Sequence, residues 1–596
     1  MGDKITIQTG GEEVRARLKD IELLHEGPVA SLACLDEESP QVNIREVWEL
    51  CLDEYGATGK GITLRELAEL AYGVFSPQTA WAAYKLLFDG IYFNGSMSAI
   101  QPRSEADVKS AEQRLNEKQM DSAKRAAFIA RLRSGKIDIE ADSPYMQDIA
   151  ALALGKALKS RSLREAGIDE TQLAAHRLLL QTGYWKPSLN PNPSRFGVSL
   201  IPALTAVPPP PPEERADLTA LPAFAIDNEW SDDPDDAVFF EPDGGGGVLY
   251  VHVADPAASI RDGTAADKEA FARGVTFYAP EGVSRMISAE AFPFYALGLS
   301  ETSPALTFKI RLDQNCSILD VEIFSSTVRV TRLSYEKADD DPRILPLIAL
   351  SGRNLEKRLD LGAALIEFPE TRVLVDDDCR VEIIPQKNYK SAAAVRECML
   401  LAGEAAARWA LERGLPFPYI TQETGDIPNV IYEGLAGSYQ LRRCMRPRNL
   451  STKPGLHWGL GLDIYSQVTS PLRRCADLLA HQQIRAAIHG EIPLDKDALL
   501  LKLGAAERAT LAVTRAERAT TLHWKLVYLL DKLDTVWDAV LLEKSGPRAA
   551  FFIPELGMET SCALDRGSKD TPLNGLVKLR LKSVKIPEYS ANFVSA

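Results

Sequence analysis

A run of closely spaced aspartates constrains the fold of this chain more than any other feature. The stretch AFAIDNEWSDDPDDAVFF, residues 223–240, carries its aspartates between two apolar segments that have strand-like alternation. Such alternation predicts a strand on each side of an acidic loop. Like charges packed this closely repel each other, so the loop needs either full solvation or a bound cation. Five aspartates fall within ten positions: Asp227, Asp232, Asp233, Asp235 and Asp236.

Two kinds of cation site use such a cluster of carboxylates. One binds Ca²⁺ structurally, and the other binds Mg²⁺ or Mn²⁺ for phosphoryl transfer. The calcium-loop pattern is absent, because no glycine follows the acids. A solvated acidic loop is the remaining alternative. The apolar flanks place the loop against a sheet and Pro234 stiffens its middle, and both features favour a metal site.

Composition bounds the class of protein. A chain of 596 residues is too long for one hydrophobic core, so several domains are expected. A net charge of −15 argues against a nucleic-acid binder with a generally basic surface, although basic residues inside a channel remain possible. The eight cysteines form no C-x-x-C pair and the seven histidines no H-x-x-x-H pair, which indicates reduced thiols and no structural zinc.

No part of the sequence reads as a membrane or export segment. No apolar run approaches the ~18 residues that a membrane-spanning helix requires. The first residues, MGDKITIQTGG, do not have the pattern of a signal peptide. We therefore expect a cytoplasmic protein that does not contact a membrane.

A proline-rich segment divides the chain into parts. Residues 207–218 combine a polyproline run with charged residues, which predicts a semi-rigid extended linker. Residues 1–206 before it are mostly helical in pattern. Residues 219–533 alternate strand-like and helix-like segments, and residues 534–596 contain short β-like runs that predict a small barrel. The expected fold class is a multidomain α+β protein.

Three helical segments and a hairpin signal predict a winged helix-turn-helix near the N-terminus. The second segment begins with a capping box formed by Thr63 and Glu66, and the third spans residues 76–90 between a Ser-Pro start and a glycine stop. The pair Asn94-Gly95 between two β-like runs then signals a hairpin. A small helical domain with an unrelated hairpin is the alternative.

The acidic loop is also part of a longer pattern. Its aspartates at 227, 233, 235 and 236 form D-x5-D-x-D-D-A, followed by a hairpin that ends in HVADP. A second pattern, HWGLGLDIYSQVTSPLRRCAD, begins more than two hundred residues later, at His457. Together these resemble, in the right order, the two signatures of the RNB family, the ribonuclease II exoribonucleases. The resemblance covers roughly residues 220–530, and the GLGL wording favours ribonuclease II over its structured-RNA relative, ribonuclease R.

The resemblance implies a metal role for the matched aspartates. Asp227 and Asp236 match direct metal ligands, Asp233 joins them or binds through water, and Asp235 matches the aspartate most closely tied to the chemical step. Mg²⁺ is the implied cofactor, with Mn²⁺ as the alternative, and carboxylates alone can hold such hard cations. A bound cation removes the repulsion within the loop.

Five further residues match family positions. Arg473 matches an arginine that contacts the scissile phosphate, a task that suits a planar, permanently charged guanidinium. Tyr278 matches a tyrosine that stacks on the 3′-terminal base, and Phe368 the aromatic that faces it. Glu397 matches a glutamate that contacts the terminal nucleotide, and Glu517 a late-helix glutamate at the RNA channel. A core or surface position without such a role is the alternative for the last four.

The chain also departs from the family pattern. Gly403 stands where the family has an asparagine, and Arg396 where it has a glutamate. Residues 1–206 contain no motif of the cold-shock barrels that many family members carry there. The segment 442–453 gathers four arginines and a lysine, which predicts a basic track for RNA in an acidic chain.

The sequence as a whole predicts a metal-dependent exoribonuclease. It should act as a monomer on single-stranded RNA with a free 3′ end, degrade it processively from 3′ to 5′, and release nucleoside 5′-monophosphates. Residues 534–596 match the place of the family's S1-like RNA-binding barrel. The alternatives are an enzyme of the ribonuclease R type that enters structured RNA, and a non-catalytic RNA-binding regulator. All four metal-site aspartates and Arg473 are present, which argues against the regulator.

Overall fold

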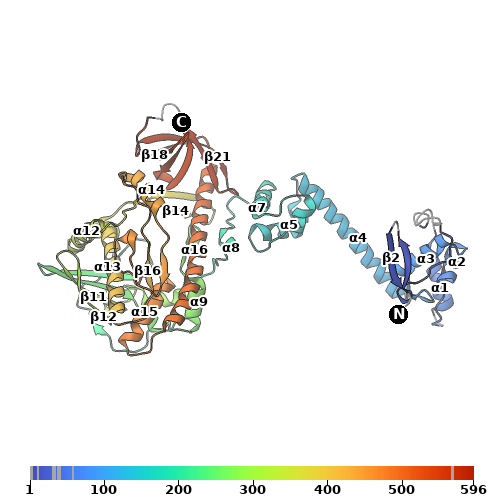
Figure 1. Ribbon diagram of the computed structural model, residues 1–596, viewed down its shortest axis with the longest axis horizontal. Helices are drawn as coiled ribbons and strands as arrows, with labels where there is room; N and C mark the ends of the chain where they lie inside the picture. The colour runs from blue at the N-terminus through green and yellow to red at the C-terminus, as the bar shows by residue number, and fades with distance from the viewer. Residues whose placement is uncertain (1–3, 10–11, 30–34, 36–41, 57–58, 565–569) are drawn as a thin grey trace. The chain divides into compact units, whose positions relative to one another are not determined.

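The computed structural model forms two compact units, Met1–Ile137 and Asp138–Ala596 (Figure 1). It describes residues 4–9, 12–29, 35, 42–56, 59–564 and 570–596. The division falls inside the predicted N-terminal region 1–206. Residues 138–206 therefore group with the RNB-like part of the chain rather than with the predicted winged helix.

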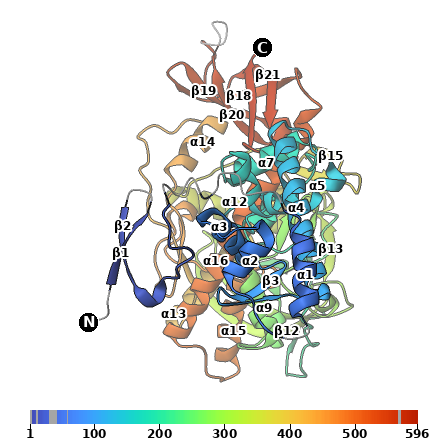
Figure 2. The same ribbon diagram turned by 90° about the vertical axis from the view of Figure 1, so that its right-hand side faces the viewer.

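The first unit contains the predicted winged helix-turn-helix (Figure 2). Thr63 and Ser76 each cap their helix with a complete capping box, which explains why the second and third helices begin where the sequence predicts. The core beneath includes Trp48, Phe93 and Ile100, each at most 1% exposed. The elements are a first hairpin of β1 (Lys4–Thr9) and β2 (Glu12–Arg17), then α1 (Ile44–Tyr55), α2 (Leu64–Tyr72), α3 (Pro77–Asp89), the hairpin of β3 (Phe93–Ser96) and β4 (Ala99–Pro102), and α4 (Glu105–Arg133).

The second unit begins with a helical region. Its helices are α5 (Ile139–Ala153), α6 (Arg161–Ala166), α7 (Gln172–Gln181) and α8 (Asn192–Arg195). Asn192 donates from its amide to the Ala519 carbonyl at 3.1 Å, and Arg195 donates to the Tyr589 hydroxyl at 2.8 Å. These contacts span more than three hundred residues of sequence and fasten the helical region to the rest of its unit.

A seven-stranded sheet forms the centre of the second unit, in the order β13-β6-β7-β8-β11-β12-β5. Strands β6 to β12 pair antiparallel, while β13 joins β6 and β5 joins β12 in parallel. Apolar side chains cover both faces of the sheet, because successive side chains of a strand point to opposite faces and both faces are buried. The strands are β5 (Ala216–Asp217), β6 (Phe224–Asp227), β7 (Asp236–Pro242), β8 (Gly246–Ala254), β11 (Ser303–Asp313), β12 (Ile318–Val328) and β13 (Thr331–Ser334).

Helices cover the two faces of this sheet (Figure 1). One apolar cluster joins the sheet to α12 and α13, and a second joins it to α9 and α16, with α15 contributing to both. The bounds of these helices are α9 (Ala265–Arg273), α12 (Leu345–Asp360), α13 (Lys390–Glu412), α15 (Cys475–Ile488) and α16 (Lys496–Leu530). The sheet end that carries the acidic loop is thereby held in a rigid frame.

Shorter elements complete this part of the chain. They are β9 (Phe277–Ala279), β10 (Gly282–Ser284), α10 (Phe292–Tyr295), α11 (Tyr335–Asp339), β14 (Thr371–Val375), β15 (Val381–Pro385), β16 (Tyr419–Thr421), α14 (Gly434–Cys444) and β17 (Asn449–Ser451).

Among the helices of the described ranges, none is long and apolar enough to cross a membrane.

The proline-rich segment lies along the second unit. Two of its proline carbonyls accept hydrogen bonds from the rest of the unit. The Tyr295 hydroxyl donates to the Pro208 carbonyl at 2.8 Å, and the Ser259 hydroxyl donates to the Pro209 carbonyl at 3.0 Å. Glu213 forms an ion pair with Arg485 at 2.6 Å. The segment has no helix before β5, in agreement with an extended conformation, but it is anchored along its length.

The C-terminal strands form the predicted small barrel. The strands are β18 (Val536–Ser545), β19 (Arg548–Ile553), β20 (Met558–Ala563), β21 (Leu576–Lys585) and β22 (Ser590–Ser595). They pair antiparallel in the order β20-β19-β18-β21-β22, and β20 also contacts β22, which nearly closes the barrel. Trp537, Phe551 and Phe552 are at most 7% exposed; the rings of Trp537 and Phe551 belong to the core of an OB-like fold, and that of Phe552 contacts Phe368.

At Gly403 the helix α13 closely approaches the segment that contains Tyr465 and Ser466. A Cβ atom at this position in α13 would lie 2.3 Å from the Ser466 carbonyl oxygen and 2.4 Å from the Tyr465 ring. We expect Gly403→Ala to lower the free energy of unfolding by roughly 1–3 kcal/mol, because backbone and a buried ring would have to move. Chemical denaturation of the full chain measures this loss.

The matched control is Gly352→Ala, which lies in α12 and has no heavy atom within 4 Å of the added Cβ. It should be neutral or stabilising by about 0.5–1 kcal/mol, because alanine favours a helix over glycine. Equal effects of the two substitutions would contradict the close approach at Gly403.

Candidate active site

The acidic loop lies at one end of the central sheet. Asp227 is the last residue of β6 and Asp236 the first residue of β7, and the two strands pair antiparallel. The amide of Ala254 donates to the Asp235 carbonyl at 2.7 Å, and the amide of Leu297 donates to the Pro234 carbonyl at 3.0 Å. The backbone of the loop is therefore fixed, and its carboxylates are held close together.

Asp235 is buried and fully engaged. Its Oδ1 accepts from the Leu472 amide at 2.9 Å, and its Oδ2 accepts from Nε of Arg473 at 2.9 Å. Burial raises the pKa of Asp235 to about 7, although the Arg473 guanidinium opposes the rise. The second signature thus contributes two hydrogen-bond donors to Asp235 of the first signature: the charged Arg473 guanidinium and the neutral Leu472 amide.

Asp236 and Asp227 lie close enough for their carboxylates to repel each other. Burial raises the pKa of Asp236 to about 7, and the neighbouring Asp227 carboxylate adds to the rise against the attraction of Arg473. Burial and the same two carboxylates also raise the pKa of Tyr335 above its ordinary range. Tyr335 reaches this place because β13 runs parallel to β6, with Ser334 beside Asp227.

Asp233 is held by an arginine that the sequence analysis did not identify. Arg285 forms an ion pair with Asp233 at 2.5 Å and with the exposed Asp232 at 2.7 Å. Burial still raises the pKa of Asp233, against the Arg285 charge. Only the folded contact between the 228–235 loop and the strand that precedes Met286 brings this arginine here, so no local pattern could have predicted it.

The donor set suits a hard divalent cation. Carboxylate oxygens are the ligands that Mg²⁺ and Mn²⁺ prefer, and burial together with the neighbouring Asp227 carboxylate raises the pKa of Asp236 at the sheet end. Asp233 and Asp235 have arginine partners, whereas Asp227 and Asp236 form no ion pair within the described residues; Asp227 accepts from the Asn228 amide at 2.7 Å and lies beside Tyr335. Within the described ranges, no three acids, cysteines or histidines are already arranged around one point as metal ligands.

The backbone of Arg473 is fixed in the fold, but its side chain is partly open to solvent. Its backbone carbonyl accepts from the Thr276 amide at 3.0 Å, while its side chain remains 44% exposed. The neighbouring Arg474 instead forms an ion pair with the buried Asp477 at 2.7 Å, and Asp477 also accepts from the Ser470 amide at 2.9 Å. The Arg474 side chain is therefore engaged within the protein.

Tyr278 and Glu517 lie beside this arrangement. The Tyr278 amide donates to Oε1 of Glu517 at 2.9 Å, which ties the β9–β10 hairpin to α16. The Tyr278 side chain is 38% exposed, and burial together with the charges of Asp233 and Asp235 raises its pKa. Burial raises the pKa of Glu517 as well. The structure thus joins Tyr278 to Glu517 and brings Tyr278 within the field of the acidic loop, while contact of either residue with RNA stays a prediction.

Phe368 lines a cavity that borders the acidic loop at Asn228. Its ring lies 5.2 Å from that of Phe552 in the barrel and 4.8 Å below the Arg442 guanidinium. It lines a cavity of about 400 Å³ that it shares with Tyr335 and with Asn228, the neighbour of Asp227. The ring is therefore near the acidic site, but its direct contacts are with the C-terminal barrel.

Glu397 lies inside the protein and not at an open surface. It is 1% exposed, and both its oxygens bind Arg358, the closer at 2.5 Å. Asn354 also donates to it at 2.9 Å. Direct contact with a nucleotide stays a prediction that this placement does not favour, since the carboxylate would have to leave a buried ion pair.

The predicted basic track is largely paired with acids. Arg442 binds Glu559 at 2.6 Å, Arg443 binds Glu543 at 2.5 Å, and Arg446 binds Asp426. Two of these acids belong to the barrel, so α14 and the barrel are held together by charge. Less positive charge is free for RNA here than the sequence suggests.

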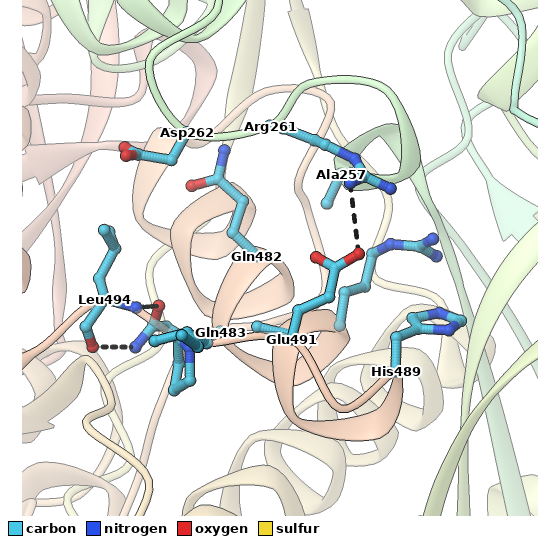
Figure 3. Close-up of a pocket in the computed structure, with 12 residues that line it drawn as sticks. Ala257, Arg261, Asp262, Gln482, Gln483, His489, Glu491 and Leu494 are labelled. Atoms are coloured by element: carbon cyan, nitrogen blue, oxygen red, sulfur yellow. Dashed lines mark hydrogen bonds and ion pairs between the residues drawn. The ribbon is translucent and has the colours of Figure 1, made fainter.

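A separate pocket of about 220 Å³ contains none of the predicted site residues (Figure 3). In it Arg261 forms an ion pair with Glu491 at 3.3 Å, and Gln483 is held by hydrogen bonds to the Leu494 backbone. Arg485, which also lines the pocket, binds Glu213 of the proline-rich segment. The pocket thus borders the anchor of that segment.

Comparisons with known proteins identify two domains in the chain. Residues 215–431 and 435–490 match the RNB domain, and residues 108–191 match a double HTH domain. The chain is 29% identical over 584 residues to an uncharacterised ribonuclease of Synechocystis, with 89% of this chain and 85% of that protein covered. It is 27% identical to the chloroplastic/mitochondrial ribonuclease II of Arabidopsis thaliana, with 72% of this chain and 61% of that protein covered.

Two solved structures share the fold. The Dss1 exoribonuclease of Candida glabrata, solved as an active-site mutant, matches with a TM-score of 0.67 at 18% identity, over 92% of this chain and 88% of that one. Yeast Ssd1, a pseudonuclease, matches with a TM-score of 0.53 at 16% identity, over 66% and 57%. The chain carries an RNB domain preceded by a double HTH domain, and the resemblance drawn from the two signatures is confirmed.

The raised pKa of Asp236 predicts how the metal-free protein responds to pH. Because this pKa is about 7 in the folded state and ~3.9 when unfolded, the folded protein binds more protons between these values and loses stability as pH rises. We expect Asp236→Asn to be more stable than wild type in EDTA at pH 8, by on the order of 1–3 kcal/mol, and similar near pH 4.5. Thermal unfolding against pH measures the difference.

Asp232→Asn is the control, because this carboxylate is in the same loop but its side chain is 73% exposed. It should keep the pH dependence of the wild type. A wild-type pH dependence in Asp236→Asn would mean that this carboxylate carries no buried charge.

Proposed function

We propose that the chain is a divalent-metal-dependent exoribonuclease that shortens single-stranded RNA from its 3′ end and releases nucleoside 5′-monophosphates. The observation that carries the proposal is the buried aspartate cluster, with an arginine on one side and the Tyr278 ring beside it. The RNB domain and the relatives named ribonuclease support it.

Arg473 gives the site a way to respond to RNA. In the RNA-free protein its Nε holds Asp235, and its side chain remains 44% exposed toward solvent. A phosphate of the substrate would compete with Asp235 for the same guanidinium, since a planar fork binds phosphate oxygens well. Binding of RNA would then release Asp235 for its role in the reaction. Divalent ions, when bound by the aspartates, would supply an activated water and compensate the charge of the departing 3′ oxygen.

The aromatic residues suit the end of an RNA chain. Tyr278 lies next to the cluster, and Phe368 with Tyr335 and Tyr389 lines the adjoining cavity of about 400 Å³. Stacking of a base on such a ring contributes ~1–3 kcal/mol and tolerates any base. We infer that these rings hold the last nucleotides, which a processive enzyme must retain while the chain shortens.

A second candidate is a non-catalytic RNA-binding protein on the same scaffold. The observation in its favour is the shared fold with Ssd1, a pseudonuclease. The four aspartates and Arg473 argue for an active enzyme, because a protein that only binds RNA has no use for a buried charge cluster. A third candidate, an enzyme of the ribonuclease R type, differs in whether it degrades duplexes with a 3′ overhang.

Incubation of the full chain with a labelled single strand and with an overhanged duplex, with Mg²⁺ or with EDTA, distinguishes the three. We expect monophosphates from the single strand only when Mg²⁺ is present. Arg473→Lys, which keeps the charge but loses the planar fork, should lower the rate by ~10²-fold with little loss of RNA affinity. Asp232→Asn is the matched control and should retain the rate. Binding without release of nucleotides would favour the regulator, and a kinetically silent Arg473→Lys would remove the proposed role of this residue.

The length of the residual oligomer tests the role of Tyr278. Tyr278→Ala should change the initial rate on long RNA little, because many other contacts hold a long substrate. It should leave a longer final oligomer, because a short product has lost those contacts and depends on stacking. Gel analysis of the limit digest measures the length. Tyr278→Phe keeps the ring and should give the wild-type length; a wild-type length in Tyr278→Ala as well would make Tyr278 a packing residue.

A further inference from the structure

The third helix of the winged helix-turn-helix carries a row of aromatic rings. Trp81, Tyr84 and Phe88 are three and four residues apart, so they follow one face of α3. The ring centroids of Trp81 and Tyr84 are 5.8 Å apart with an interplanar angle of 16°, and those of Tyr84 and Phe88 are 6.2 Å apart at 30°. Lys85 places its Nζ 5.4 Å from the centroid of the Trp81 ring.

This row changes from core to surface along the helix. Tyr84 packs partly against the apolar core of the unit, while Phe88 at the end of α3 is 79% exposed. A single exposed apolar side chain needs no explanation. A stacked row that ends in an open ring is different, because the outer face of the last ring is free to stack on another planar group.

A cleft of about 600 Å³ begins where this row ends. It is bordered by Asp89 at the end of α3 and by Arg114 and Lys118 on α4, which are one helical turn apart. Within the part of the chain that the structure describes, Arg114 and Lys118 form no ion pair. Arg103 also lines the cleft, but it donates to the Gly90 carbonyl at 2.5 Å and holds the end of α3 in place. The cleft therefore offers two open cations beside the carboxylates of Asp89 and Asp107, and it begins at the residue that follows the exposed Phe88.

We propose that this surface binds single-stranded RNA outside the catalytic domain, with bases stacked on Phe88 and phosphates bound by Arg114 and Lys118. Proteins that hold single strands without sequence preference combine stacking rings with cations that follow the backbone. The two open cations favour an anionic polymer over an apolar protein partner. The inference rests on the proposed function for the identity of the polymer, but not on hydrolysis.

The test uses the full chain in EDTA, where binding is measured by fluorescence anisotropy without turnover. The long probe is a 30-nucleotide oligouridylate, which has nucleotides beyond those that the catalytic site holds, and a 6-nucleotide oligouridylate serves as a probe of the catalytic site. We expect Phe88→Ala to weaken the long probe roughly 5- to 100-fold and to leave the short probe unchanged. Arg114→Glu with Lys118→Glu should weaken it further and reduce its dependence on salt by ~0.7 in the logarithmic slope for each lost phosphate contact.

Phe88→Trp keeps a stacking surface and should retain the affinity of the wild type. Leu50→Ala, an apolar side chain of α1 that is 58% exposed, is the matched control and should also have no effect. Unchanged affinity for the long probe in both Phe88→Ala and the double charge reversal would overturn the inference, and leave this face for a protein partner. Loss of hydrolysis with binding of both probes intact would contradict the proposed function and not this surface.

Discussion

The ion pair between Arg473 and Asp235 joins the two signatures of this chain, which are 238 residues apart in sequence. Around it the other parts of the site assemble through the backbone. The amide of Leu472 binds the same carboxylate, and the carbonyl of Arg473 receives the Thr276 amide, which positions the hairpin that carries Tyr278. Glu517 then fixes that hairpin to α16. One charged contact therefore connects the sheet end, the hairpin and the longest helix of the unit.

Charge balance explains why the acidic loop can fold at all. Arg285 and Arg473 offset Asp233 and Asp235, while burial and mutual repulsion raise the pKa of Asp236 to about 7. In the folded protein the carboxylates of Asp233 and Asp235 are therefore paired with arginines. The negative charge of the remaining carboxylates can attract a cation. Because both arginines face the same cluster, their release and the arrival of substrate or metal are expected to be linked.

Sequence patterns predicted the parts of the fold that depend on local signals. Capping residues such as Thr63 and Ser76 begin helices where predicted, and the alternating flanks of the acidic loop are strands. The two signatures, which the sequence matched as long motifs, also meet in the fold through Asp235 and Arg473. Each of these features depends either on residues that are close together in sequence or on a long motif that the family shares.

The remaining features depend on contacts between distant segments. Arg285 binds the loop, Tyr335 arrives through a parallel strand pair, and Glu397 is buried against Arg358. None of these has a local signal, because each follows from tertiary pairing. The proline-rich segment was expected as a spacer, yet its carbonyls and Glu213 find partners on the second unit, since buried polar groups need hydrogen bonds.

The central claim is that the sheet-end aspartates form a divalent-cation site. Electron paramagnetic resonance of Mn²⁺ at pH 8 tests it most directly, by counting bound ions in the wild type and in Asp227→Asn with Asp236→Asn. The account predicts saturable Mn²⁺ binding in the wild type that the double substitution removes, while Asp232→Asn retains it. Equal Mn²⁺ binding in the wild type and the double variant would contradict the claim.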